Sequence, residues 1–273
     1  MQVSIKSDQI VEIRDAAGNL CGIYHYEDPF KSFFRGLYTP GGKDVVALPP
    51  PEYPHHKGLQ FGLCTSLANF WEEDEANVPP GNILPFGKQQ TTNLKLMPPD
   101  VGMGFTQEIL WATGNESVFN ETRSISMEEK QGAYVWTWQT TLTAAREVQI
   151  INSVWGVPSY CVPLFSYCGL GLRLARDLFE NGEVLPTGVE CGKPPAYVSF
   201  RGKGAEVTFK QDYGPANALF VTTYEQAPPY GPDGPGFAFM GLVPSSYEFK
   251  PIFAVISSSQ TSSNSFLISS SGL

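Results

Sequence analysis

Apolar and polar residues alternate with a period of two along much of the chain, a pattern typical of strands that bury one face. The clearest case spans residues 133–144, where Tyr134, Trp136 and Trp138 fall on one face of the expected strand. Segments of the same kind follow each other with short polar breaks, at 109–111, 117–125 and 146–154. Long neighbouring strands with short connections predict an antiparallel meander.

Turn-forming residues divide the rest of the chain into shorter strands. Residues 15–19, which read Asp-Ala-Ala-Gly-Asn, predict one hairpin, and the Gly-Lys-Gly sequence at 202–204 predicts a second. Residues 76–102 are rich in Pro, Gly and Asn and are expected to form a long irregular stretch, while 174–181 is expected to be a short helix. The pattern predicts an all-β fold, a large antiparallel double-sheet β-sandwich with long loops.

Composition supports this fold class and suggests where the domain ends. The chain has 27 Gly and 23 Pro, 13% aromatic residues and only 16% charged residues, which favours strands and loops over helices. We expect one sandwich domain over residues 1–256. Residues 257–273 hold nine serines and no charge, and are expected to form a disordered tail.

The net charge and the lack of long apolar segments limit the classes of binding partner that we expect. The formal net charge is −9 and the isoelectric point about 4.9, which argues against binding to nucleic acid or to an anionic membrane surface. There is no apolar run long enough to span a membrane, and the first residues lack the pattern of a signal peptide. We therefore expect a soluble cytoplasmic protein that binds a small molecule. The sequence does not indicate its oligomeric state.

The strongest candidate for catalytic chemistry is a proline-rich loop. The chain has three histidines, and two of them, His55 and His56, are adjacent and flanked by Glu52 and Lys57. Histidine titrates near neutral pH and is the usual group for proton transfer, so this loop combines an acid, a base and a cation. The alternative interpretation is a solvated polar loop that leads into a strand.

Three charged residues on expected strands are further candidates. Arg173 lies between two leucines, which indicates an ion pair or an anion-binding position. Glu121 and Arg123 are two residues apart on one strand, so their side chains share a face. They either pair with each other or serve a common site.

A metal or cofactor is not predicted. Neighbouring residues of an extended backbone point to opposite sides, so His55 and His56 could share a metal only if the loop bends between them. The five cysteines form no C-x-x-C pair, and the glycines around 169–171 form no dinucleotide-binding pattern.

Several short motifs resemble those of the PmoA-like family, whose label is "methane oxygenase PmoA". The resemblance covers roughly residues 34–256 and is carried by Leu-Tyr-Thr-Pro-Gly-Gly at 37–42, Pro-His-His-Lys-Gly-Leu-Gln-Phe-Gly at 54–62, Asn-Phe-Trp at 69–71, Glu-Thr-Arg-Ser-Ile at 121–125 and Tyr-Cys-Gly-Leu-Gly-Leu-Arg at 167–173. The family loop usually reads His-Pro-His-His-Arg, whereas this chain has Tyr53 and Lys57 at the first and last positions. The resemblance implies a fold similar to galactose-mutarotase-like sandwiches, in which a histidine and a carboxylate exchange protons with a bound sugar.

These observations predict an isomerase or lyase that transfers protons without a metal, by epimerisation, β-elimination or an isomerising cyclisation, on a small oxygenated metabolite or sugar derivative. His55, His56 and Glu121 are the expected catalytic residues. The expected substrate-binding residues are Glu52, Lys57, Trp71, Arg123 and Arg173. Two alternatives remain open, a non-catalytic carbohydrate-binding protein and the metal-dependent oxygenase that the family label suggests.

Overall fold

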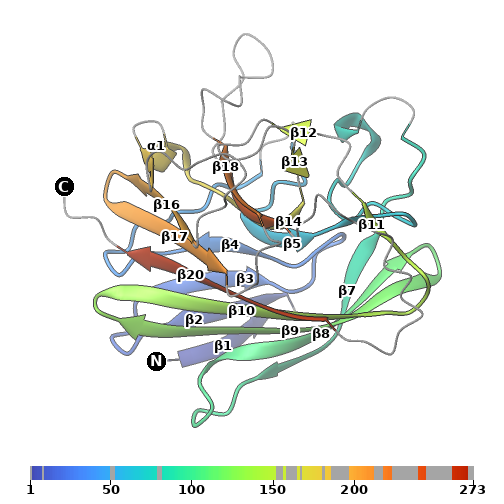
Figure 1. Ribbon diagram of the computed structural model, residues 1–273. Helices are drawn as coiled ribbons and strands as arrows, with labels where there is room; N and C mark the ends of the chain where they lie inside the picture. Colours follow the sequence, from blue (N-terminus) through green and yellow to red (C-terminus); the bar gives the residue numbers. More distant parts are fainter. Residues whose placement is uncertain are drawn as a thin grey trace.

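The structure is a computed structural model. It describes residues 2–7, 9–49, 53–78, 82–151, 156–157, 165–166, 168–179, 182–185, 197–211, 218–222, 239–243 and 260–269. Within these residues the fold is all-β, as the sequence predicts, and its main feature is a pair of eight-stranded antiparallel sheets (Figure 1). The expected helix over 174–181 is reduced to the single turn α1 (Arg176–Phe179).

The first sheet contains the N-terminal strands and three strands from the second half of the chain. In spatial order its strands are β1 (Gln2–Ser7), β2 (Ile10–Arg14), β3 (Leu20–His25), β4 (Phe33–Leu37), β5 (Leu59–Gly62), β14 (Gly169–Arg173), β19 (Phe239–Val243) and β18 (Ala218–Thr222).

The second sheet contains the long strands of the meander. In spatial order its strands are β15 (Glu183–Leu185), β16 (Tyr197–Gly202), β17 (Ala205–Gln211), β20 (Gln260–Ser269), β10 (Ala133–Ala144), β9 (Glu116–Lys130), β8 (Met103–Thr113) and β7 (Lys88–Leu96). The remaining elements are the strand pairs β6 (Cys64–Thr65) with β11 (Ile150–Ile151) and β12 (Gly156–Val157) with β13 (Phe165–Ser166), and the 3-10 turn η1 (Glu75–Asn77).

An aromatic core joins the inner faces of the two sheets. Tyr24 of β3 lies with its ring centroid 4.9 Å from Phe34 of β4 and 4.9 Å from Phe105 of β8. Phe34 in turn makes an edge contact with Trp136 of β10, at 5.1 Å. Gly22 leaves room for this packing, since a Cβ there would lie 2.7 Å from the Trp136 ring. The period-two pattern over 133–144 therefore identified a true core strand.

Two expectations about the chain path are corrected by the structure. Residues 260–269, expected to be part of a disordered tail over 257–273, form strand β20, which lies between β10 and β17 (Figure 1). Its Ile268 side chain is fully buried, and its backbone pairs with both neighbours, which offsets the cost of ordering a serine-rich segment. Within the stretch 76–102, expected to be irregular, Lys88–Leu96 forms the edge strand β7.

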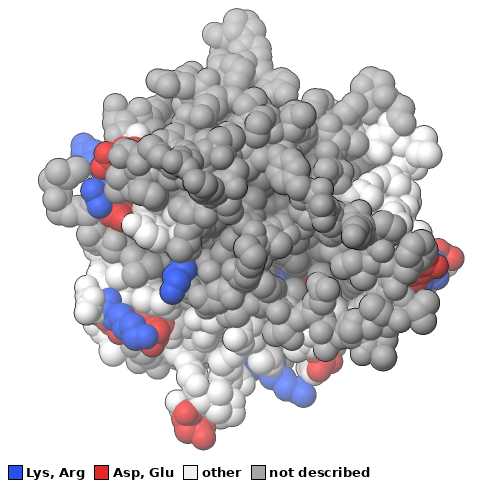
Figure 2. All heavy atoms as spheres, in the orientation of Figure 1, with Lys and Arg blue, Asp and Glu red and all other residues white. Residues whose placement is uncertain are grey.

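Surface features agree with the low charge content. On the face shown in Figure 2, the coloured side chains form small scattered groups, several of them of mixed sign, and the described residues there form no large patch of one charge. Pairs such as Arg146 with Glu116, 2.6 Å apart, are of this mixed kind. No helix among the described residues is long and apolar enough to cross a membrane.

Candidate functional site

The candidate site lies on the face of the first sheet that points away from the core. Along β5, Leu59 and Phe61 belong to the core, so Gln60 between them points to the opposite face. Along β14, Leu172 is a core residue and Arg173 points away from it. Gln60 is paired across the strands with Gly171, two residues before Arg173, so a polar amide and a guanidinium share this outer face.

A tight loop places the two histidines over this face. The His56 N–H donates to Tyr53 O at 3.0 Å, and the Gly58 N–H donates to His56 O at 3.2 Å. Gly58 has a φ of +56°, and a Cβ there would lie 2.1 Å from Phe34 O, so the bend requires glycine. The loop thus bends where an extended backbone would have separated His55 and His56.

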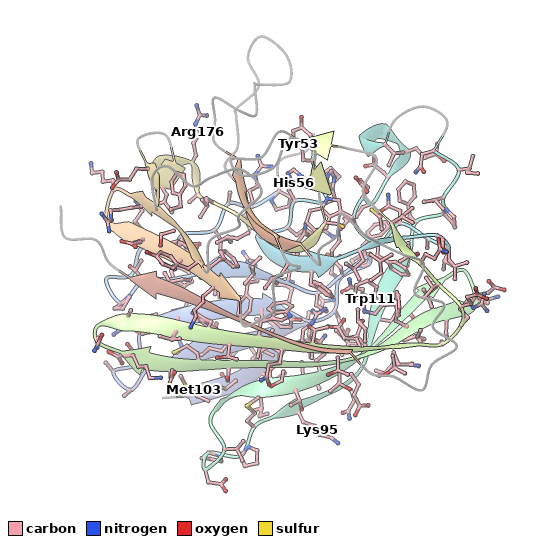
Figure 3. All side chains as sticks on the ribbon, in the orientation of Figure 1. Tyr53, His56, Lys95, Met103, Trp111 and Arg176 are labelled. Atoms are coloured by element: carbon pink, nitrogen blue, oxygen red, sulfur yellow. The ribbon has the colours of Figure 1, made fainter. Side chains whose placement is uncertain are left out.

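The two imidazole rings contact each other directly. The His55 and His56 ring centroids are 4.3 Å apart in an edge-to-face arrangement, and Tyr53 stacks on His56 at 5.2 Å with an interplanar angle of 13°. Figure 3 shows Tyr53 and His56 together above β5 and β14, with Trp111 on the other side of these strands, in the core. Both histidines are buried, with 4% and 2% of their surface exposed.

Arg173 fixes the protonation pattern of His56. The Arg173 Nη1 and His56 Nδ1 atoms are 2.9 Å apart. A guanidinium can only donate, so His56 Nδ1 is the acceptor and carries no proton. Burial, followed by the neighbouring His55 ring and the Arg173 charge, holds the pKa of His56 well below its usual value. His56 is therefore a neutral ring whose proton is on Nε2.

His55 is also neutral. Its burial, and then the positive charges of Lys31, Arg173 and Lys57, hold its pKa well below the usual value. Its Nδ1 atom is buried and has no hydrogen-bond partner among the residues that the structure describes. A neutral imidazole nitrogen of this kind is a proton acceptor or donor that no described residue occupies.

A buried ion-pair chain borders the histidines. Lys57 Nζ lies 2.6 Å from Asp28 Oδ1 and 2.8 Å from Glu73 Oε2, and Lys31 Nζ lies 3.2 Å from Glu73 Oε1. Lys31 Nζ also donates to the Trp71 carbonyl oxygen. The Lys57 backbone N–H donates to Gln60 Oε1 at 3.2 Å, which ties the loop to β5.

The turn that carries Trp71 and Glu73 is built by Asn69. Its Oδ1 accepts from the backbone N–H groups of Trp71, at 2.9 Å, and Glu72, at 3.1 Å. Trp71 is fully buried, and the Lys31 Nζ atom lies 5.5 Å from the centroid of its ring. It packs beside the ion-pair chain, where it covers Gly62 of β5.

The structure brings together some of the predicted site residues and separates others. His55, His56, Lys57 and Arg173 form one cluster, and Trp71 borders it. Glu52 lies outside the described residues. Glu121 and Arg123 lie elsewhere, in the core between the two sheets.

Glu121 and Arg123 form a buried ion pair whose atoms are all engaged in protein contacts. Arg123 Nε donates to Glu121 Oε1 at 2.8 Å, and its Nη2 donates to Glu121 Oε2 at 2.9 Å. The same carboxylate accepts from Trp111 Nε1 and Thr140 Oγ1, at 2.7 and 3.0 Å. Arg123 Nη1 also donates to Tyr24 OH at 2.8 Å. Of the two alternatives that the sequence left open, the structure therefore shows that Glu121 and Arg123 pair with each other. This ion pair joins the two sheets.

Sequence reasoning missed several members of the cluster. Asp28 and Lys31 come from the β3–β4 connection and Glu73 from the turn after β6, while Gln60 and Tyr53 flank the histidines. Gln60 could have been found, because it is a polar residue between core positions of a strand. Asp28, Lys31 and Glu73 carry no local signal, since only the tertiary fold brings them to Lys57.

The cluster does not fit a metal ion. His56 Nδ1 is occupied by Arg173, and the Glu73 carboxylate is held between two lysines. Three cationic side chains beside the histidines would repel a divalent cation. Among the residues described, no three His, Cys, Asp or Glu side chains are grouped as a metal would need.

Comparison with known proteins gives the family but no activity. No curated protein matches the chain. A family model described as "Family of unknown function (DUF6807)" matches residues 15–225, which include β3–β5, β14, the histidine loop and the Glu121–Arg123 pair. The match covers more than half of the chain, and the protein belongs to this family of unknown function.

Proposed function

We propose that the protein is an enzyme that transfers protons to and from a small oxygenated molecule without a metal. His55 is the proposed acid–base group, and His56, held by Arg173, is the proposed positioning residue. The observation that carries the proposal is the buried, neutral histidine pair, in which Nδ1 of His55 has no hydrogen-bond partner among the described residues. Buried and perturbed histidines of this kind are typical of catalytic sites.

The surrounding charges suit transfer in both directions. Neutral His55 can accept a proton from a C–H bond next to a carbonyl group or from a hydroxyl group. The imidazolium that forms then faces Lys31, Lys57 and Arg173, which favour its deprotonation. It therefore returns the proton readily, on the same or the other side of the substrate. Epimerisation and isomerisation need proton transfer in both directions. β-Elimination begins with the same removal of a proton from the substrate.

Negative charge on the substrate would bring His55 into its working range. An enolate or oxyanion formed beside the cluster would counteract the lysine and arginine charges that depress the His55 pKa. The base is then strongest when the substrate is bound and charge develops on it. Glu73 and Asp28 hold the two lysines in place for this role, because each lysine has a carboxylate partner within 3.2 Å.

The resemblance to PmoA-like proteins gives a competing hypothesis, a metal-dependent oxygenase. The histidine cluster does not supply a ligand set for that chemistry, because Arg173 occupies His56 Nδ1 and two lysines hold the Glu73 carboxylate, so we do not favour it. A non-catalytic carbohydrate-binding protein is the remaining alternative. It would need no neutral histidine pair next to three cations, but only turnover measurements distinguish it from an enzyme.

Deuterium incorporation tests the proposal across several compound classes at once. The purified protein is incubated in D2O with aldoses, ketoses, uronic acids and 2-hydroxy or 3-oxo acids, and ¹H NMR follows each C–H signal. We expect one compound class to lose a C–H signal, and His55→Gln to slow this loss by at least about 10². His25→Gln is the matched control, because His25 stacks on Phe33 of β4 and lies outside the histidine loop. A compound that binds but exchanges no C–H proton would indicate a binding protein instead.

A further inference from the structure

Three buried polar atoms around Lys57 have no hydrogen-bond partner among the described residues. They are His55 Nδ1, Gln60 Nε2 and Glu73 Oε1, the last of which has only its ion-pair contact with Lys31. Their residues are only 4%, 0% and 7% exposed. Buried polar groups are nearly always hydrogen-bonded, and one that is left without a partner destabilises the fold. Three such atoms around one lysine therefore indicate that something other than the described residues completes their bonding.

Lys57 connects the three residues that carry these atoms. It is two residues from His55, its backbone N–H donates to Gln60 Oε1, and its Nζ atom lies 2.8 Å from Glu73 Oε2. The bond from the Lys57 N–H also fixes the orientation of the Gln60 amide, since an N–H group requires an oxygen acceptor. The Gln60 atom without a partner is therefore the NH₂ group, a donor.

The chemistry of the three atoms selects a hydroxyl group. Gln60 Nε2 can only donate, Glu73 Oε1 can only accept while ionised, and His55 Nδ1 does either. A hydroxyl both accepts and donates, so hydroxyl groups can satisfy the amide and the carboxylate alike. A ligand carboxylate would be repelled by Glu73, and an ammonium group by Lys31, whose Nζ lies 3.2 Å from the same Glu73 oxygen.

We propose that this site binds a polyhydroxylated ligand, hydroxyl groups of which bond to Gln60 Nε2 and to Glu73 Oε1 while a neighbouring oxygen faces His55. Gln60 and Glu73 are then the residues that determine specificity. The inference rests on the proposed function for the position of the site and names its substrate class. Gly171, the cross-strand neighbour of Gln60 on β14, contributes no side chain to this face.

Binding measured by saturation-transfer NMR tests this inference. The probes are D-galactose, D-xylose, D-glucuronate and myo-inositol, each monosaccharide compared with its available deoxy analogues. Gln60→Glu keeps the acceptor for the Lys57 N–H but replaces the donor with a carboxylate oxygen, and Gln60→Met removes the amide without adding a charge. Gln90→Met on the exposed side of β7 is the matched control. Near-UV circular dichroism checks that each variant is folded.

We expect at least one polyhydroxylated probe to bind, and one of its deoxy analogues and both Gln60 variants to weaken binding at least about tenfold. The inference is overturned if no probe binds, or if binding is unchanged in both variants, in which case these atoms hold water only. The proposed function fails separately, if a bound probe exchanges no C–H proton in D2O. The proposed function would stand without this inference if a substrate that exchanges a C–H proton lacks hydroxyl groups and binds equally well to both Gln60 variants.

Discussion

The neutral histidine pair predicts that acid destabilises the fold. The folded protein keeps His55 and His56 unprotonated, because burial and nearby positive charges hold their pKa values well below 6.5. The unfolded chain protonates both rings as the pH falls through about 6.5. The unfolded state then binds more protons than the folded state, so the free energy of unfolding falls with decreasing pH. Each histidine contributes a slope of up to about 1.4 kcal/mol per pH unit, and the pair up to about 2.7.

Urea unfolding between pH 7.5 and 5.5 measures this slope. At each pH the free energy of unfolding is extrapolated to water for the wild-type protein and for His55→Gln, His56→Gln and the double variant. The slope, unlike the absolute stability, is insensitive to packing lost through the substitution itself. We expect each single variant to reduce the slope below pH 6.5 by up to about half, and the double variant to remove most of it.

The third histidine provides the control. His25 is less buried than the pair, and burial followed by the Arg35 charge lowers its pKa as well. His25→Gln should therefore reduce the slope less than either His55→Gln or His56→Gln, because the pKa values of His55 and His56 are held further down. A wild-type stability that stays flat or rises on acidification would refute the assignment of two neutral rings. The same conclusion would follow if the double variant kept the full slope.

Three further substitutions test the fold. Glu121→Gln leaves the buried Arg123 guanidinium without its counter-charge and should cost about 3–5 kcal/mol in urea unfolding, whereas a loss below about 1 kcal/mol would mean that the pair is not structural. Ile268→Ala should cost about 2–5 kcal/mol, because the side chain is fully buried in β20, while an unchanged midpoint would restore the disordered-tail interpretation. Gly58→Ala should lower both the melting temperature and the deuterium exchange, because its Cβ would lie 2.1 Å from Phe34 O, and wild-type behaviour in both would contradict the loop geometry.

Much of the fold was predictable because its strands carry strong local patterns. The alternation of large aromatic residues over 133–144 led directly to β10, and the Asp-Ala-Ala-Gly-Asn turn to the β2–β3 hairpin. β20 was missed because its serine-rich composition suggests disorder. In the structure, β10 pairs with the whole of β20 and β17 pairs with part of it. The signal that could have revealed it is the apolar triplet at 266–268 after the serines.

The candidate site was predictable only in part, for a physical reason. The histidine loop stood out because histidine is scarce and the two residues are adjacent. The ion-pair chain did not, because Asp28, Lys31 and Glu73 come from separate connections that meet only in the folded protein. Glu121 and Arg123 resembled site residues by spacing alone, and their burial between aromatic side chains could not be read from that spacing.

The protonation state of the two rings is the most direct test of the account. Long-range ¹H–¹⁵N NMR of the histidine side chains distinguishes each neutral tautomer from the imidazolium, and the single Gln variants assign the three histidines. We predict that at pH 6 His55 and His56 are both neutral, with His56 protonated on Nε2 and its Nδ1 accepting the Arg173 bond. An imidazolium at either position, or a proton on His56 Nδ1, would contradict the proposed acid–base site.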